Sequence, residues 1–305
     1  MIEVDKRDIT PAVAAGLVAA QFPQWAELPV VPVATDGWDN TTFRLGEKLS
    51  IRLPSADDYV EQVEKEQRWL PILAAHLPVR IPEPVAVGRP DDRFPRPWSI
   101  YRWIDGETAA VDRIRDLTEL AADLAGFITA LEAIDASGGP PPGAHNFFRG
   151  GPLTVYDAEC RAAIERAADV IDVAVAGRAW EAALASTWEW PPVWVHGDIA
   201  PSNLLVGGGV LRAVIDFGCS AVGDPACDLV MAWTFFDDDS RAVFRDALDF
   251  DEATWSRARG WALWKALITV VHASATGPDP DAAARRWGWR FSALDVVESV
   301  LAEQA

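Results

Sequence analysis

The sequence of 305 residues has few cysteines and no long apolar run, and these two absences narrow the classes of protein to consider. Its three cysteines, Cys160, Cys219 and Cys227, form no CxxC pair of the kind that binds structural zinc. An odd number of cysteines, with no apolar signal segment at the start, is typical of reduced thiols, so we expect a cytoplasmic protein. No apolar run reaches about 18 residues, and we expect no membrane-spanning helix.

Positive charge is also scarce. Only 27 Lys and Arg residues stand against 46 Asp and Glu residues, which gives a net charge of −19. Such a surface repels nucleic acids and anionic membranes, so we expect neither as a partner. The same field attracts cations, although an acidic surface can also serve solubility alone. With 50% hydrophobic residues and 15 tryptophans, the chain is of the globular class, and a monomer and a dimer both remain open.

Short segments rich in Val, Thr, Ile and Leu dominate the first part of the chain. Thr10 followed by Pro11 predicts the start of an opening helix that runs to Gln21. Residues 29–54 predict two or three antiparallel strands and residues 57–77 a helix, and EPVAVGRP and PWSIYRWI predict further strands. We therefore expect a small antiparallel sheet with one internal helix in residues 1–104.

From residue 105 onward the pattern is mainly helical. Helices are predicted from Arg113 to Ile134, over 155–186 with a break near Gly177, and over 225–305, where SRARGWALWKALITVVHA is the most buried stretch. Between them, two apolar runs flank Gly207-Gly208-Gly209 and predict a β-hairpin. The fold class is therefore α+β, with a small sheet lobe and a larger helical lobe in residues 105–305.

The loop before this hairpin, in the stretch WVHGDIAPSNLLV, carries the most informative residues. Asp198 and Asn203 precede the first strand of the hairpin, and Asp216 follows the second strand in VIDFG. Because a hairpin returns the chain to its starting point, we expect these three side chains to lie close together. Carboxylate and amide oxygens are the ligands that Mg²⁺ prefers, usually with substrate phosphates completing its shell. One carboxylate is then left to orient a nucleophilic hydroxyl, the arrangement used for phosphoryl transfer from a nucleotide.

The order of these motifs resembles that of kinases, in which His-x-Asp, an Asn and then Asp-Phe-Gly follow one another. With GDPACDL and the earlier segments GWDNTTFRLGEKLSIRLP and WSIYRWIDGE, the sequence from about residue 34 to about residue 265 is similar to the aminoglycoside phosphotransferase family. The resemblance implies a protein-kinase-like bilobal fold. Residues 1–104 would form the nucleotide-binding lobe, with a hinge at its end, and residues 105–305 the catalytic and substrate-binding lobe.

The resemblance also implies a role for each matching residue. Asp198 would be the catalytic carboxylate, which orients the acceptor hydroxyl or accepts its proton. Asn203 and Asp216 would bind Mg²⁺. His196 and Asp228 would support the catalytic loop by hydrogen bonding rather than take part in the chemistry.

In the first lobe, Arg52 of SIRLP stands where a kinase strand cation contacts the nucleotide phosphates, with Glu66 as its ion-pair partner. Lysine is usual there, and arginine keeps the charge but is a planar fork, so Lys48 on the same strand is the alternative. The loop TDGWDNTTF contains the single glycine Gly37, followed by Asn40, and would meet the phosphates through backbone N–H groups.

The segment YRWID resembles the hinge between the two lobes. Backbone groups of Arg102 and Ile104 would then hydrogen-bond the adenine edge. Either ATP or GTP could serve as the phosphate donor.

The sequence indicates several classes of acceptor molecule rather than one. The family phosphorylates hydroxyls of aminoglycosides, which are polycations held by carboxylates, and the net charge of −19 suits such a substrate or a related antibiotic. Kinase-like relatives act on macrolides, choline, homoserine and sugars, and these remain alternatives. The candidate acceptor-binding carboxylates are Asp157, Glu159 and Asp237. The tryptophans Trp233, Trp287 and Trp289 would line an acceptor pocket or belong to the core, and His272 would be a core histidine.

Two other classes of function fit the sequence less well. In a protein kinase, a long activation loop follows Asp-Phe-Gly, but here only Cys219 to Val222 separate that motif from GDPACDL. A catalytically inactive nucleotide-binding module would be expected to lack Asp198 or Asp216, and both are present.

Overall fold

The protein is described from a computed structural model that covers residues 5–34, 37, 39–276 and 281–303. It divides into two compact units. Unit 1 comprises Met1–His76, Arg80–Asp105 and Asp216–Gly218, and unit 2 comprises Leu77–Val79, Gly106–Ile215 and Cys219–Ala305. The division after Asp105 lies next to the expected boundary, whereas the Asp-Phe-Gly segment is grouped with unit 1 although unit 2 surrounds it in the sequence.

Unit 1 is built on a five-stranded antiparallel sheet with the strand order β1-β2-β3-β5-β4. The strands are β1 (Val30–Pro32), β2 (Asn40–Leu45), β3 (Leu49–Pro54), β4 (Pro84–Gly88) and β5 (Trp98–Arg102). On β3 every residue is buried except Arg52, which is partly exposed. Because β3 lies between β2 and β5, the sheet fixes the position of Arg52 from both sides.

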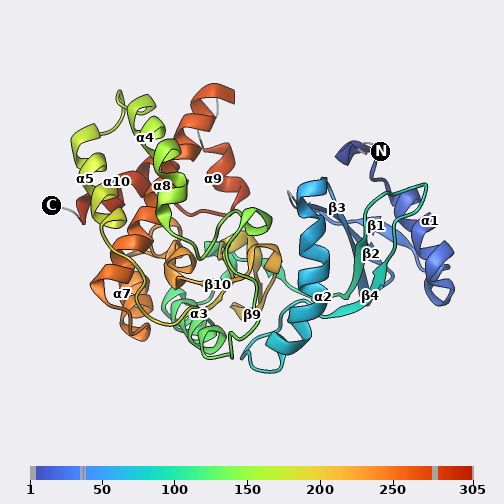
Figure 1. Cartoon of the computed structure of the whole chain (residues 1–305). Helices are drawn as coiled ribbons and strands as arrows, with labels where there is room; N and C mark the ends of the chain where they lie inside the picture. Colours follow the sequence, from blue (N-terminus) through green and yellow to red (C-terminus); the bar gives the residue numbers. More distant parts are fainter. Residues whose placement is uncertain (1–4, 35–36, 38, 277–280, 304–305) are drawn as a thin grey trace. The chain divides into compact units, whose positions relative to one another are not determined.

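Two helices cover this sheet, on opposite sides of it (Figure 1). The first, α1 (Pro11–Gln21), begins as predicted, because the Thr10 hydroxyl accepts a hydrogen bond from the N–H of Val13. Its buried face packs into one apolar cluster with β2, β3 and β5. The second, α2 (Val60–Ala74), follows a short 3-10 turn and carries Glu66. The strands and helices expected in residues 1–104 are thus confirmed.

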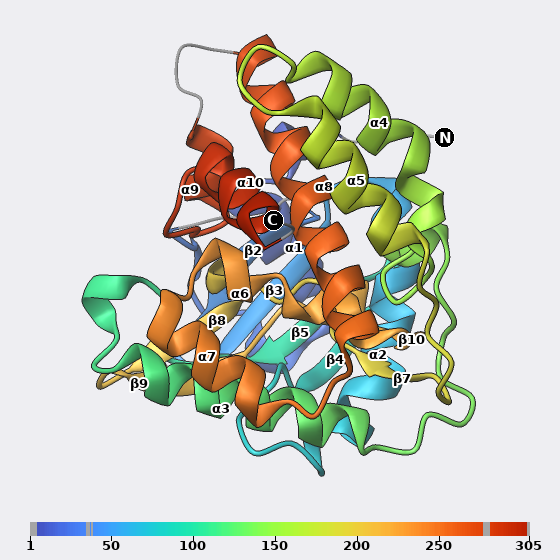
Figure 2. The same cartoon turned by 90° about the vertical axis from the view of Figure 1, so that its left-hand side faces the viewer.

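Unit 2 is mainly helical. Its helices are α3 (Leu117–Glu132), α4 (Asp157–Arg166), α5 (Val173–Leu184), α6 (Met231–Thr234), α7 (Asp238–Ala247), α8 (Glu252–Thr276), α9 (Ala282–Arg286) and α10 (Ala293–Ala302). Helix α8 runs between α4 and α5 on one side and α9 and α10 on the other (Figure 2). It is buried through most of its length, as predicted, but His272 near its end is exposed, so the expectation of a core histidine was wrong.

Five short strands position the loops of unit 2. They are β6 (Glu107–Thr108), β7 (Val193–Val195), β8 (Leu204–Gly207), β9 (Val210–Val214) and β10 (Ala221–Gly223). The predicted hairpin is confirmed as β8–β9, and Gly208 and Gly209 at its turn have φ angles of +65° and +83°, which glycine adopts without strain. Strand β7 pairs with β10, so the loops on either side of the hairpin are held at both ends.

The predicted break near Gly177 was wrong, because α5 continues through that residue. The helical stretch is interrupted earlier, before Asp172. The Asp172 carboxylate accepts hydrogen bonds from the N–H groups of Ala174 and Val175 and so caps a new helix. A capping aspartate starts a helix more strongly than one glycine stops it. Among the described residues, no helix has both the length and the apolarity needed to cross a membrane.

Candidate active site

The loop of residues 196–203, which the sequence predicts to be the catalytic loop, is held by the carboxylate of Asp228. Its two oxygens accept hydrogen bonds from the backbone N–H groups of His196 and Gly197, each at 2.7 Å. The imidazole of His196 is fully buried, and its Nε2 lies 3.0 Å from the carbonyl oxygen of Ile215. Both residues therefore orient the backbone of the loop.

Gly197 allows this loop to turn. Its φ is +84°, and a Cβ atom there would lie 2.3 Å from the carbonyl oxygen of Cys219. Only glycine fits both conditions. The tight turn brings Asp198 to the surface of unit 2, with a side chain that is 36% exposed.

Asn203 connects this loop to the hairpin. Its Nδ2 donates to the backbone oxygen of Asp198 at 2.9 Å and to the Oδ2 of Asp198 at 3.1 Å. The backbone carbonyl oxygen of Asn203 accepts a hydrogen bond of 2.8 Å from the N–H of Ile215, the residue immediately before Asp216. Asp198 and Asn203 are therefore neighbours, as the sequence predicted. Their proximity to Asp216, which belongs to unit 1, stays a prediction.

Two cations that the sequence did not single out lie beside Asp198. The Nζ of Lys265, on α8, forms an ion pair of 3.0 Å with the Oδ1 of Asp198, and the Lys265 side chain is only 12% exposed. Arg149 lines the same small pocket. Burial raises the pKa of the Asp198 carboxyl, but the charges of Lys265 and Arg149 outweigh burial and lower it to about 2. Asp198 is therefore ionised at neutral pH.

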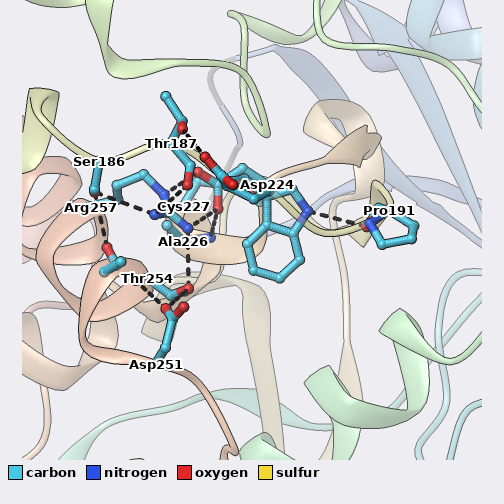
Figure 3. A network of polar contacts seen from close by, with 12 residues as sticks. Ser186, Thr187, Pro191, Asp224, Ala226, Cys227, Asp251, Thr254 and Arg257 are labelled. Carbon is cyan, nitrogen blue, oxygen red and sulfur yellow. Dashed lines mark hydrogen bonds and ion pairs between the residues drawn. The ribbon is translucent and has the colours of Figure 1, made fainter.

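Asp224, the other acidic residue of GDPACDL, belongs to a network of polar contacts around Arg257 (Figure 3). Asp224 caps the short 3-10 helix Pro225–Leu229, which carries Asp228, by accepting a hydrogen bond from the N–H of Ala226. The other oxygen of Asp224 lies 2.7 Å from the Nε of Arg257 on α8, and both side chains are buried. This paired network joins the catalytic loop to the central helix of unit 2.

In unit 1, the expected ion pair between Arg52 and Glu66 is present, with 3.3 Å between Nη1 and Oε1. Nη2 of Arg52 also lies 2.7 Å from the Oδ1 of Asp216. The Tyr101 hydroxyl donates to Glu66, and Lys65 donates to the carbonyl oxygen of Gly218 at 2.6 Å. Burial opposes the charge of Arg52, but Glu66 and Asp216 outweigh it and raise its pKa above the usual range.

Asp216 itself has a φ of +68°, in the left-handed region that residues other than glycine seldom adopt. Strained backbone of this kind is concentrated at functional sites. The contacts of Arg52 with Asp216 and of Lys65 with Gly218 hold the two ends of the Asp-Phe-Gly segment within unit 1.

For the other residues that were predicted to bind the nucleotide, the structure corrects two of the predictions, those for Lys48 and the N–H of Arg102. Lys48 lies in the turn before β3 and is exposed, so it is not an alternative to Arg52 on that strand. The N–H of Arg102 donates to the carbonyl oxygen of Glu83 at 2.9 Å, so that group is not open to adenine. Ile104 is nearly buried after β5, Asn40 is buried at the start of β2, and Gly37 is exposed. Thr35, Asp36 and Trp38 of the same loop lie outside the described residues.

The three candidate acceptor carboxylates already have partners. Asp157 accepts hydrogen bonds from Arg161 and from the indole of Trp180, and Glu159 accepts one from the indole of Trp264. Asp237 caps α7 and pairs with Arg290. These contacts account for the acidic side chains without an acceptor.

The candidate tryptophans divide into two groups. Trp233 is fully buried, and its indole N–H donates a hydrogen bond to the Glu303 carboxylate. Trp289 is also buried, so both residues belong to the core. Trp287 is partly buried and lies at the site, because its ring centroid is 5.2 Å from the Nζ of Lys265. Its backbone oxygen also accepts a hydrogen bond from the N–H of Ser202 in the catalytic loop.

The family model described as "Phosphotransferase enzyme family" matches residues 30–261. No curated protein matches the chain. Among solved structures, the GDP complex of aminoglycoside 2'-phosphotransferase-IIIa is similar, with a TM-score of 0.71, 19% identity, and coverage of 97% of this chain and 100% of that one.

Two further structures extend the comparison. A ternary complex of APH(2")-IIa with streptomycin and ATP has a TM-score of 0.60 and 15% identity, and covers 97% of this chain and 100% of its own. The macrolide 2'-phosphotransferase MphH from Brachybacterium faecium has a TM-score of 0.56 and 24% identity, with 93% of this chain and 97% of that chain covered. At identities this low, the similarity shows a common fold and no more than that.

Proposed function

The chain belongs to the phosphotransferase enzyme family, and from this premise we propose that it transfers the γ-phosphoryl group of ATP or GTP to a hydroxyl of a small molecule. The observation that carries the proposal is the geometry around Asp198. This carboxylate is 36% exposed, and it stands on a loop whose backbone is fixed by Asp228, His196 and Asn203.

Asp198 would position the acceptor. An ionised carboxylate accepts a hydrogen bond from a hydroxyl, orients its oxygen for in-line attack and takes its proton as the new bond forms. Asn203 holds Asp198 through both its backbone and its carboxylate oxygens and so fixes the direction of the acceptor.

We propose that Asn203 and Asp216 would hold a magnesium ion, because each has an oxygen of the kind that Mg²⁺ prefers. Asn203 uses its Nδ2 to hold Asp198, which leaves its amide oxygen as a possible ligand, and Asp216 uses Oδ1 for Arg52, which leaves Oδ2. No group of three or more His, Cys, Asp or Glu within the described ranges could hold a metal by itself. Such a sparse set suits Mg²⁺, which is commonly bound by one or two side chains together with substrate phosphates. When bound, the ion would neutralise the charge that develops on the phosphoryl oxygens.

Arg52 would contact the nucleotide phosphates. Glu66 holds its guanidinium from one side, and Tyr101 fixes Glu66 in turn, so the arginine is positioned in advance. Gly37 and Asn40 would belong to the loop over the phosphates, and Ile104 would offer its backbone to the base. The N–H of Arg102 is excluded from this role by its bond to Glu83.

Aminoglycosides are the first acceptor class to test. The similar solved structures include enzymes named for aminoglycosides, and the net charge of −19 would attract a polycation. A macrolide is the second candidate. One similar structure is a macrolide phosphotransferase. Choline, homoserine and sugars complete the panel.

The proposal also includes the cellular compartment and the class of partner. None of the three cysteines, which all lie within the described residues, forms a disulfide, and this supports a reducing compartment such as the cytoplasm. The acidic surface supports a small-molecule partner rather than a nucleic acid. A monomer and a dimer are both compatible with the proposal.

The test is a coupled assay of nucleotide consumption by purified protein with Mg-ATP or Mg-GTP and each acceptor of the panel. We expect acceptor-dependent turnover that falls by about a thousandfold or more in Asp198→Ala, while affinity for the nucleotide changes by less than about threefold. Asp169→Ala, at an exposed position of unit 2, removes the same charge and should leave turnover unchanged. Near-normal turnover in Asp198→Ala would disprove the assigned role.

A further inference from the structure

Arg149 has a buried donor that nothing satisfies. Its Nη1 has no hydrogen-bond partner among the described residues. The guanidinium also hydrogen-bonds the Tyr156 hydroxyl and lies among aromatic rings, 4.8 Å from the ring centroid of Trp264, 5.1 Å from Trp261 and 5.8 Å from Tyr156. Rings of this kind stabilise a cation but do not replace a hydrogen-bond acceptor. A buried charged donor without a partner costs about 1–3 kcal/mol or more, so an oxygen atom that accepts a hydrogen bond from Nη1 would be stabilised at this position.

A small pocket meets this donor. Arg149, Asp198 and Lys265 line it together, and the rest of its wall consists of Gly197, Ile199, Cys227, Val230, Trp261 and Trp264. Its volume is about 10 Å³. That is room for about one water molecule, and therefore for one oxygen atom of a ligand.

The charges that line this pocket do not balance. Lys265 is paired with Asp198 at 3.0 Å, which leaves Arg149 as a second cation without a second carboxylate in the wall. Two other carboxylates are near, but each is held by neutral donors. Asp228 accepts the backbone N–H groups of the catalytic loop, and Glu159 accepts the indole N–H of Trp264 at 2.7 Å. The wall of the pocket itself therefore contains two cations and one carboxylate, Asp198, and its excess positive charge lies beside the proposed catalytic carboxylate.

We propose that Arg149 and Lys265 form an oxyanion subsite that binds one oxygen of a phosphoryl or carboxylate group next to Asp198. The subsite rests on the proposed function for its role in turnover, although its binding of an anion does not. A planar guanidinium and an ammonium on a rigid helix hold such an oxygen from two directions. Lys265 is shared between Asp198 and the incoming anion, so the resting ion pair competes with the ligand.

Two sources can supply this oxyanion. It can be the phosphoryl group in transit from the nucleotide, in which case the subsite stabilises the transfer for every acceptor. It can also be a carboxylate or phosphate of the acceptor itself, in which case the subsite selects acidic acceptors. The chemistry of the subsite is the same in both cases, and kinetics separate them.

Binding is measured first, by calorimetric titration of nucleotide-free protein with inorganic phosphate. We expect Lys265→Met to weaken phosphate binding by at least about tenfold and Lys265→Arg to restore most of it. Asp198→Asn should tighten binding by about threefold or more, because it releases Lys265 and removes the repelling carboxylate. Part of this tightening should be lost when Asp198→Asn is combined with Lys265→Met, whereas a purely structural role for Lys265 predicts the same tightening with either residue at position 265. Arg178→Met, which removes an exposed cation on α5, should have no effect.

Arg149 is tested by a conservative change, since its aromatic surroundings make removal of the side chain a risk to folding. Arg149→Lys keeps the charge but loses the fork, and we expect phosphate affinity to fall by about fivefold while the melting temperature stays within a few degrees of wild type. Absence of phosphate binding in the wild type, or equal affinity in wild type, Lys265→Met and Arg149→Lys, overturns the proposal. These titrations need no turnover, so they can fail while the proposed function stands, and the reverse also holds.

Steady-state kinetics then identify the source of the oxyanion. If it is the phosphoryl in transit, Lys265→Met lowers kcat for all acceptors and leaves their KM values nearly unchanged. If it belongs to the acceptor, Lys265→Met raises KM for a hydroxy acid but not for the corresponding amide. Equal kcat and KM values in wild type and Lys265→Met for every acceptor that is turned over contradict the subsite.

Discussion

Glu132 is a carboxyl group in an environment that suits its neutral form. It lies at the end of α3, and its Oε1 is buried with no hydrogen-bond partner among the described residues. Burial, and then the negative charge of Asp228, raise its pKa from the ordinary 4.5 to about 8. The folded protein therefore keeps this proton through a range of pH in which the unfolded chain loses it.

This difference predicts how stability depends on pH. Because the folded state binds the extra proton, the free energy of unfolding falls as pH rises from 4.5 to about 8, by several kcal/mol at about 1.4 kcal/mol per pKa unit. Glu132→Gln should flatten this dependence and be more stable than wild type at about pH 8, as urea unfolding at several pH values will show. Glu165→Gln, at an exposed position of α4, is the control. The same slope in Glu132→Gln and wild type would contradict the assignment.

Residue by residue, local signals were predictable and distant partners were not. The contact between Asp198 and Asn203 follows from a fixed spacing inside one loop, and the pair of Arg52 and Glu66 from one strand and the helix after it. Lys265 lies 67 residues from Asp198 in the chain, within an apolar helical stretch. A lysine among tryptophans on the buried helix was the available signal, and only the packing of α8 against the loop turns it into a site residue.

Among the elements, two glycines show why similar residues have different structural meanings. Gly177 was expected to break a helix but lies inside α5, with nothing within 4 Å of an added Cβ. Gly197 lies in a turn with positive φ, and the backbone of Cys219 occupies the space that an added Cβ atom would need. The sequence shows the same letter at both places, and only the surrounding backbone distinguishes a tolerated glycine from a required one.

This contrast gives a paired prediction. Gly197→Ala should displace the catalytic loop, because its Cβ would lie 2.3 Å from the carbonyl oxygen of Cys219, an atom that cannot move aside as a side chain can. We expect turnover to fall by about a hundredfold or more and the protein to lose stability. Gly177→Ala should keep full turnover and gain about 0.5–1 kcal/mol, the usual preference for alanine within a helix. Assays and thermal melts of both variants check this, and an active, stable Gly197→Ala would refute it.

For the whole molecule, the excess of negative charge sets two electrostatic effects against each other. Surface ion pairs are weakened by salt, but each contributes only about 0–1 kcal/mol. The net charge of −19 repels itself in the compact state, and salt screens that repulsion as well. With 46 acidic residues against 27 basic ones, many carboxylates have no cation to pair with, so relief of repulsion should be the larger effect.

We therefore expect the melting temperature at about pH 8 to rise by several degrees between about 20 mM and 500 mM NaCl. Choline chloride should act equally, since screening depends on ionic strength and not on binding of a particular cation. The gain should shrink towards the isoelectric point near 4.5, where the net charge disappears. Scanning calorimetry in both salts at several pH values measures this. A melting temperature that falls with salt at about pH 8 would mean that the paired networks, such as Arg257 with Asp224 and Arg52 with Glu66, outweigh the repulsion.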